Sequence, residues 1–291
     1  MDIIFRIDNY VHRFLRKLRL CPRYFSYNQI ILRYIKRDSK GLHPEKYTYN
    51  GKIEQSRIAW VFWAQGAESL PPILKSCYES IKRNSGEYEI HFVDMKNVDD
   101  YLDIPDYIKE KVKNGQISLT HFSDFLRVAL LNRWGGYWVD VTLYLSQSLP
   151  IQDSLFTIKQ PANADYISRC QWAGYLWYMP RQHPLAQFLY DYLTQYWSHH
   201  DVVVDYLLID YAIRVFYEMN PEFAKEIDSL PISNPDHYFF QSPGCESQYS
   251  TSDWKRITSH TIFFKTTWKK QYKEFVNGKL TYYGKLLKGE L

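Results

Sequence analysis

The sequence lacks the short motifs that mark several large enzyme classes. No GxGxxG segment follows an expected strand, which argues against a dinucleotide-binding site. The GxxxxGKS or GxxxxGKT loop of P-loop ATPases is missing too, and so are GxSxG and HExxH. Chemistry based on a phosphate-binding loop, a nucleophile elbow or a helix-borne zinc site is therefore not expected.

Cysteine is scarce and widely spaced. Cys21, Cys77, Cys170 and Cys245 form no CxxC pair, which argues against a zinc site and against a small disulfide scaffold. We therefore expect reduced thiols in a cytoplasmic protein. Long apolar runs are missing as well: none approaches the roughly 20 residues that span a bilayer, and the N-terminus lacks the continuous apolar segment of a signal peptide.

The 291-residue chain has an otherwise ordinary globular composition with a surplus of aromatic residues. Its length allows one large domain or two small ones, and a content of 45% hydrophobic and 23% charged residues is typical of a globular protein. The net charge of +4 is too small for a polyanion binder, so no nucleic-acid partner is expected. An aromatic content of 18% suits either stacking on bases or sugars or an aromatic-rich core.

Positive charge is concentrated in residues 1–40. Apolar residues recur there at helical spacing between positions 3 and 20, and basic residues fill much of the rest. Such a segment can lie in the headgroup layer of an anionic membrane, or it can pack on its own domain or a partner. We expect membrane contact at the inner face of the cell membrane, followed by a polar linker over residues 38–56. The basic residues are Arg6, Arg13, Arg16, Lys17, Arg19, Arg23, Arg33, Lys36, Arg37 and Lys40.

Residues 57–291 are predicted to form one domain in which strands alternate with helices. In such a parallel α/β sheet, ligands bind beyond the carboxyl ends of the strands. Trp63, Asp94 and Asp140 fall at these ends, and Asp94 is interpreted as a helix N-cap. The expected strands are 58–63, 88–93 and 137–141, and the expected helices are 72–83, 105–113 and 119–134.

The second half of the chain has a less regular pattern. Asp205 and Asp210 lie five residues apart in an apolar segment, so one can reach an acceptor while the other caps or forms an ion pair. Gln171 and Trp172 are further candidates for acceptor contact. The expected strands are 156–159 and 175–178, the helices are 184–197 and 202–218, and loops with short strands follow Asn220.

One stretch combines a helix, a glycine stop and a strand that ends on a carboxylate. Asp124 and Arg127 are three residues apart, so both can project from one helical face. Gly135 or Gly136 can end that helix in the left-handed conformation. The aromatic and β-branched strand that follows ends at Asp140. These side chains predict a polar pocket in an apolar frame.

Together these segments resemble a known group of enzymes. The Trp-x-x-Trp-x-x-Gly pattern ending at Gly66, the Ser-Asp-x-x-Arg pattern at 123–127 and the Gly-Gly-x-Trp-x-Asp pattern ending at Asp140 are similar to those of bacterial capsular polysaccharide synthesis glycosyltransferases. They are similar also to the wider group of DxD sugar transferases, which includes yeast-type α-mannosyltransferases and glucosylating clostridial toxins. The resemblance implies a GT-A fold: an α/β, single Rossmann-like nucleotide-sugar-binding domain with a mixed central sheet. It also implies retention of the anomeric configuration.

The resemblance assigns donor-binding roles by position. Trp63 would stack on the nucleobase. Asp124 and Arg127 would bind the hydroxyls of the donor sugar and the diphosphate. Tyr137 or Trp138 would pack beneath the nucleotide.

Asp140 would be the first acid of the DxD motif and would bind a divalent cation, Mn²⁺ or Mg²⁺. This sequence departs from the motif at the third position, where Thr142 replaces the second acid. A hydroxyl is a poor substitute for a carboxylate on a divalent ion. His260, Lys265 and Lys269 are therefore candidates for direct neutralisation of the diphosphate.

The expected function is a retaining glycosyltransferase that moves a hexose from a UDP-linked sugar to a lipid-linked oligosaccharide in surface polysaccharide synthesis. The catalytic group stays open among Asp140, Asp205, Asp210 and Gln171, because the leaving diphosphate can itself assist the acceptor hydroxyl. The alternative is a non-catalytic glycan-binding or scaffold protein on a degenerate transferase fold, which Thr142 favours. A toxin-like transferase that acts on protein ranks below both.

Overall fold

The computed structural model describes residues 3–18, 26–48 and 54–291 of the chain. Arg19, Cys21 and Arg23 of the expected basic segment, and residues 49–53 of the expected linker, lie outside these ranges. The longer helices are α1 (Ile3–Lys17), α2 (Tyr27–Asp38), α3 (Pro72–Arg83), α4 (Asp106–Lys113), α5 (Leu119–Trp134), α6 (Pro184–His199), α7 (Leu208–Met219), α8 (Pro221–Ser229), α9 (Thr251–Thr258) and α10 (Tyr282–Leu287).

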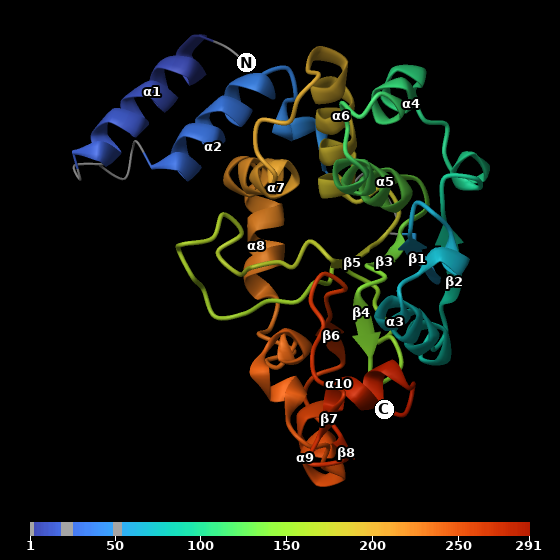
Figure 1. Cartoon of the computed structure of the whole chain (residues 1–291). Coiled ribbons are helices and arrows are strands. Elements are labelled where there is room, and N and C mark those ends of the chain that lie inside the picture. The colour runs from blue at the N-terminus through green and yellow to red at the C-terminus, as the bar shows by residue number, and fades with distance from the viewer. Residues whose placement is uncertain (1–2, 19–25, 49–53) are drawn as a thin grey trace.

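A four-stranded mixed sheet forms the centre of the molecule, in the order β2-β1-β3-β5 (Figure 1). Strand β1 pairs in parallel with both β2 and β3, and β5 closes the edge in the antiparallel direction. The predicted α/β class with a mixed central sheet and added N-terminal helices is therefore confirmed. The strands are β1 (Ile58–Phe62), β2 (Glu89–Val93), β3 (Gly136–Val139), β4 (Leu143–Leu145), β5 (Leu176–Met179), β6 (Phe263–Lys265), β7 (Phe275–Val276) and β8 (Lys279–Leu280).

Alternating side chains place large aromatic residues on one face of this sheet. Trp60 is paired with Trp138, and Trp138 is paired with Trp177 across β1, β3 and β5. Successive residues of a strand point to opposite faces, so Tyr137 and Tyr178 lie on the other side. Trp60 is thus a core residue, as predicted, and all three tryptophans are at most 1% exposed. Much of the aromatic surplus therefore belongs to the core.

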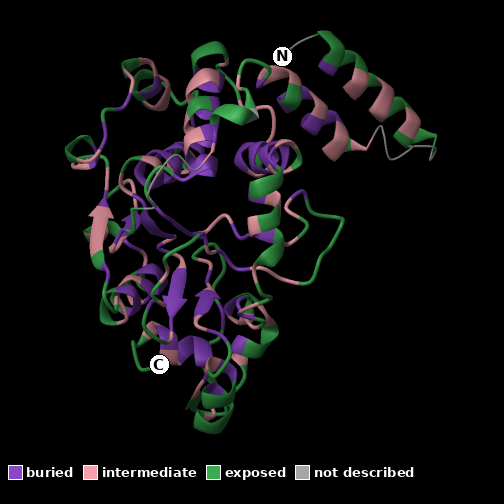
Figure 2. Ribbon diagram, turned by 180° about the vertical axis from the view of Figure 1, so that it is seen from behind, coloured by how far each residue is buried: buried purple, intermediate pink, exposed green. Residues whose placement is uncertain are grey.

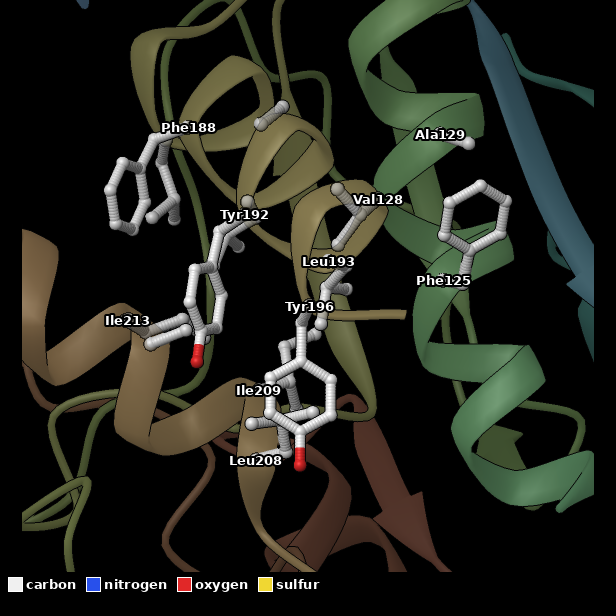
Figure 3. Packing of buried hydrophobic residues seen from close by; sticks show 14 of the residues in the cluster. Phe125, Val128, Ala129, Phe188, Tyr192, Leu193, Tyr196, Leu208, Ile209 and Ile213 are labelled. Carbon is white, nitrogen blue, oxygen red and sulfur yellow. The ribbon is translucent and has the colours of Figure 1, made fainter. Parts of the chain in front are cut away.

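The tryptophan face is covered by a helical layer built from α5, α6 and α7. Figure 3 shows their apolar side chains meeting between the helices, with Tyr192 and Tyr196 of α6 reaching toward α7. Tyr196 also fixes the chain ahead of α7: its hydroxyl donates to the Val202 carbonyl and accepts from the Val204 amide. The helix predicted at 202–218 therefore begins only at Leu208.

The region after Asn220 contains more helix than predicted. Helices α8, α9 and α10 each begin at a polar N-cap whose side chain accepts a backbone amide, namely Asn220, Ser250 and Thr281. The prediction of loops was wrong here because these helices are short and their apolar pattern is weak. The strand predicted at 156–159 is reduced to a single bridge between Phe156 and Tyr178.

The N-terminal helices lie against the helical layer at the edge of the molecule (Figure 1). Helix α2 packs on α7 and buries Ile30, Ile31 and Ile35, whereas α1 packs on α2. Arg33 of α2 donates to Asp8 of α1 at 2.9 Å. Most of α1 remains exposed or half-buried (Figure 2). Within the described residues, no helix combines the length and apolar character needed to cross a membrane.

Candidate functional site

A cavity of about 1200 Å³ opens beyond the carboxyl ends of β1 and β3, as the parallel sheet predicts. One wall is formed by α5 and by the start of α7. The opposite wall is formed by the segment around residues 165–175 and by the loop that follows β6. Strand β4 follows β3 along the chain and pairs with β6 in a separate two-stranded sheet (Figure 1).

Asp140 lies at the floor of the cavity, directly after β3, and both of its oxygens are engaged. Trp138 Nε1 donates to Oδ1 at 3.2 Å, and Lys265 Nζ donates to Oδ2 at 2.6 Å. Lys265 reaches this position because the antiparallel pair β4–β6 places it opposite Leu143. Its ammonium also donates to Thr142 Oγ1 at 2.5 Å.

Asp124 and Arg127 approach Asp140 from α5. Arg127 Nη1 lies 3.1 Å from Asp124 Oδ1, and Arg127 Nη2 lies 3.9 Å from Asp140 Oδ1. The guanidinium also lies over the Trp138 ring, 5.2 Å from its centroid. Exposed i,i+3 pairs are worth about 0.2–0.5 kcal/mol, but here the two side chains are only 9% and 13% exposed. A largely desolvated pair that lines a cavity is a candidate for a functional site.

The two carboxylates have opposite pKa shifts. Burial is the main cause that raises the pKa of Asp124 to about 7; Arg127 opposes this shift, and the nearby Asp210 and Asp140 add to it. Burial opposes ionisation of Asp140 also, but Lys265 and then Arg127 outweigh it, so the pKa of Asp140 is lowered. Asp140 therefore carries a fixed negative charge, whereas Asp124 titrates near neutrality.

Titration of Asp124 predicts a pH-dependent site. Ionised Asp124 pairs with Arg127 and can accept hydroxyl groups, so ligand affinity should rise as pH increases through about 7. Because its folded pKa exceeds the unfolded value, its contribution to stability is present at low pH and is lost as pH rises through the folded pKa. Asp124→Asn should therefore flatten the activity profile between pH 6 and pH 8, and it should gain thermal stability relative to wild type toward pH 8.

The measurements are kcat/KM and melting temperature as functions of pH. Asp106→Asn, at the exposed start of α4, is the control and should keep the wild-type profile. An unchanged profile in Asp124→Asn would contradict this assignment.

Aromatic side chains border the cavity at the end of β1. Trp63 follows the strand, and its Nε1 donates to Ser69 Oγ at 3.0 Å. Its ring meets Trp268 edge to face at 5.9 Å. Trp268 and the neighbouring Lys269 are exposed, and both line the cavity in the loop after β6.

Asp210 lines the cavity from the first turn of α7, on the same wall as α5. Trp172 Nε1 donates to Asp210 Oδ1 at 2.7 Å, and burial raises the pKa of the carboxyl. Asp205 does not line the cavity; it accepts a hydrogen bond from Tyr27 Oη at 3.0 Å. Of the two acids, Asp210 therefore lines the cavity, whereas Asp205 accepts hydrogen bonds from Tyr27 and from the Leu207 amide outside it.

Several predicted residues are held outside the cavity. His260 Nε2 lies 3.0 Å from Asp236 Oδ2 on the surface. Gln171 joins Arg214 and Asp228 in a hydrogen-bond network behind Trp172. Tyr137 is buried on the far face of the sheet, where its hydroxyl donates to the Pro150 carbonyl. Trp138 lies beneath Arg127 and is 1% exposed.

Sequence analysis missed four exposed aromatic side chains that line the cavity. They are 46–63% exposed, which is unusual for residues of this size. Nothing in the sequence distinguishes them from the many core aromatics, because only the fold shows which rings face solvent. They are Tyr166, Tyr206, Tyr238 and Trp268.

The residues at the end of β3 fit a divalent cation poorly. In the described part of the chain, no group of three or more His, Cys, Asp or Glu side chains is arranged to hold a metal ion. Asp140 is the one acid of the Asp140–Thr142 segment, and Lys265 already contacts its Oδ2 atom. A Mg²⁺ or Mn²⁺ ion prefers several oxygen ligands without a competing ammonium group.

The profile of a family described as capsular polysaccharide synthesis protein matches residues 12–286, so the chain belongs to this family. The resemblance inferred from the residues is thereby confirmed. The O-glycosyltransferase braB of Annulohypoxylon truncatum is 24% identical over 102 residues, which cover 32% of this chain and 24% of that protein. The O-glycosyltransferase PaGT of Phomopsis amygdali is 30% identical over 117 residues, which cover 37% and 28%.

The chain thus spans about a quarter of the length of the curated relatives it matches. A solved structure, the PaToxG glycosyltransferase, covers 79% of this chain and 94% of its own at 12% identity and a TM-score of 0.41. That likeness is too distant to assign any residue.

Proposed function

We propose that the protein is a retaining glycosyltransferase that transfers a hexose from a UDP-linked sugar to an oligosaccharide in capsule or other surface polysaccharide synthesis. The observation that carries the proposal is the arrangement at the cavity floor, where Arg127 and Lys265 flank Asp140. Two cations at the end of a parallel strand suit the negative charge that develops on a leaving diphosphate. Membership of the capsular polysaccharide synthesis family supports the same conclusion.

The donor fits the cavity with its base at the end of β1 and its sugar above α5. Trp63 and Trp268 offer aromatic surfaces for the base, and base–aromatic stacking is worth about 1–3 kcal/mol in single-strand binding proteins. Arg127 and Lys265 would then face the diphosphate. Asp124 and Asp210 would accept hydrogen bonds from sugar hydroxyls.

The proposed reaction makes one glycosidic bond and breaks the bond between the donor sugar and the diphosphate. The acceptor hydroxyl oxygen bonds to the anomeric carbon as the bond from that carbon to the diphosphate oxygen breaks. The bonding electron pair leaves with the nucleoside diphosphate, and the acceptor proton passes to a phosphate oxygen. The cationic side chains hold the charge, and no protein nucleophile is required for retention.

The acceptor is proposed to be a lipid-linked glycan bound at the exposed aromatic side of the cavity. Tyr166, Tyr206 and Tyr238 present half-exposed or more exposed rings near Asp210. Sugar rings have apolar faces that stack on aromatic side chains, while their hydroxyls need polar partners.

The direct test is a screen for nucleoside diphosphate release. Purified protein is incubated with UDP-, GDP-, CDP- and ADP-linked hexoses, and slow release from one UDP-sugar is expected even without acceptor. Thermal shift with the free nucleotides provides a second readout, because a ligand that binds the folded state raises its stability. Binding of glycans without release from any donor would instead support the non-catalytic scaffold alternative.

Helix α1 supports the proposed attachment to an anionic membrane surface. Ile3, Ile7, Tyr10, Phe14 and Leu18 follow one another at spacings of three or four and are 51–74% exposed. At this spacing they form one apolar stripe along the helix. Basic residues lie exposed beside the stripe, namely Arg6, Arg13, Arg16 and Lys17. An apolar stripe with a basic border matches the interfacial boundary of an anionic bilayer.

Membrane attachment through α1 predicts that charge on the stripe releases the protein. Changing Ile7, Tyr10 and Phe14 together to glutamate should lower partition onto vesicles of neutral and anionic phospholipid at least tenfold, because each ring or branched side chain loses about 1.5–3 kcal/mol of apolar transfer. Vesicle cosedimentation measures the effect. The control changes the remote exposed Ile151 and Ile232 to glutamate and should partition like wild type. Equal partition of all three proteins would refute the attachment.

A further inference from the structure

The ammonium group of Lys265 lies against Asp140, the one acid of the Asp140–Thr142 segment. This ammonium is held on three sides: Asp140 Oδ2 lies at 2.6 Å, Thr142 Oγ1 lies at 2.5 Å, and the Tyr175 ring centroid lies at 4.5 Å. The side chain is 17% exposed. A carboxylate, a hydroxyl and an aromatic face hold this ammonium group at a fixed position, unlike that of a mobile surface lysine.

The hydroxyl group of Thr142 connects Lys265 and Asp140. It accepts from Lys265 and donates toward Asp140 Oδ2 at 3.4 Å. A carboxylate at this position would give two adjacent acids and favour a divalent cation. A threonine leaves a single negative charge, which one ammonium group neutralises. The replacement of the second acid by Thr142 and the placement of Lys265 therefore act together, because they pair one carboxylate with one ammonium group.

Backbone pairing between β4 and β6 holds Thr142 and Lys265 in place. Strand β4 begins directly after the Asp140–Thr142 turn, and Leu143 is in register with Lys265 of β6. Thr266, the next residue, donates through both its amide and its hydroxyl to the Thr142 carbonyl at 2.8 Å. The lysine cannot leave the acid without disturbing this ladder or changing its own side-chain rotamer.

We propose that this chain carries out glycosyl transfer without a divalent cation, and that the ammonium group of Lys265 supplies the charge that stabilises the leaving diphosphate. This inference rests on the proposed function. As the bond between the anomeric carbon and the diphosphate oxygen breaks, its electron pair moves onto that oxygen. Lys265 stays protonated and donates a hydrogen bond to the diphosphate, and Arg127 lies on the other side of Asp140. The acceptor proton leaves with the nucleoside diphosphate.

The test compares donor cleavage by the full-length protein in EDTA, in Mn²⁺ and in Mg²⁺. Rates within about twofold in the three conditions are expected. A second readout uses the electron paramagnetic resonance signal of free Mn²⁺. Protein and UDP together should lower this signal no more than UDP alone does. Activity that disappears in EDTA and returns with Mn²⁺ would overturn the inference. The absence of cleavage in every condition would instead overturn the proposed function.

Variants at Lys265 separate its charge from its packing. Lys265→Met should lower the cleavage rate about a hundredfold, as does the loss of one preorganised donor at a developing negative charge. Lys265→Arg keeps the charge and should retain much more of the rate. Lys279→Met, on the distant β7–β8 hairpin, is the matched control and should behave like wild type. Equal rates for folded Met and Arg variants would show that the charge at this position has no role in cleavage.

Discussion

Replacing Asp140 by asparagine is expected to lower kcat/KM for nucleotide-sugar cleavage by about 10²–10³-fold. The carboxylate holds Lys265 at 2.6 Å and lies 3.9 Å from Arg127, so it positions both cations that face the cavity. A neutral amide keeps the volume but leaves two partly desolvated cations around an uncharged group. Their mutual repulsion would displace them from the positions that the diphosphate requires, and small displacements are costly in catalysis.

The measurement is donor cleavage with a matched melting curve. Asp236→Asn serves as the control, because Asp236 also pairs with a basic side chain, His260, but does so outside the cavity. That variant should cleave the donor at the wild-type rate. Wild-type activity in a folded Asp140→Asn protein would show that the residues at the end of β3 have no role in donor cleavage.

The part of the site carried by α5 and β3 could be predicted from the sequence with useful accuracy. Helix α5 spans the predicted residues, because an N-cap serine and a two-glycine stop define both of its ends. The strand after it begins at Gly136 and ends next to Asp140, as its aromatic and β-branched composition indicated. Local signals of this kind are strong when an element is long or is bounded by glycine and capping residues.

The contact between Lys265 and Asp140 could not be derived in the same way. It joins residues 125 positions apart through β4 and β6, which are only three residues each. A three-residue strand has too little alternation to reveal its partner or its register. Sequence analysis therefore left His260, Lys265 and Lys269 as equal candidates. The fold places Lys265 on the acid, Lys269 at the cavity rim and His260 on Asp236.

For the aromatic residues too, the sequence pattern predicts which face of a strand a ring occupies but not which rings of the loops and turns are exposed. Trp60 and Trp63 are three positions apart, so strand periodicity placed them on opposite faces, and the structure buries Trp60 while Trp63 borders the cavity. The same periodicity cannot tell whether Tyr206 in a turn faces solvent. That depends on where α7 begins, and this is set by the contact of Tyr196 with Val202 and Val204. Tertiary contacts therefore decide which aromatic rings can meet a ligand.

Gly136→Ala is expected to lower the free energy of unfolding by about 3–5 kcal/mol. Gly136 has a φ of +95°, and a Cβ atom added there would lie within 2.2 Å of the Ile58 carbonyl oxygen, so the distance excludes the side chain. Ile58 opens β1 and Gly136 opens β3, and these strands are neighbours in the central sheet. The second glycine of the pair thus permits close approach of two strands, a need that its position as a helix stop did not reveal.

Two other glycines separate the cost of the clash from the cost of the backbone conformation. Gly278 has a φ of +73° with no atom within 4 Å of an added Cβ, so Gly278→Ala should cost about 1–2 kcal/mol from the left-handed conformation alone. Gly41 has neither constraint, and Gly41→Ala should change stability by about 0.5 kcal/mol or less. Urea unfolding midpoints with unchanged slopes measure the differences. Equal losses at Gly136 and Gly278 would show that the strands can separate without cost, and Asp140 would then lack the rigid support that its role requires.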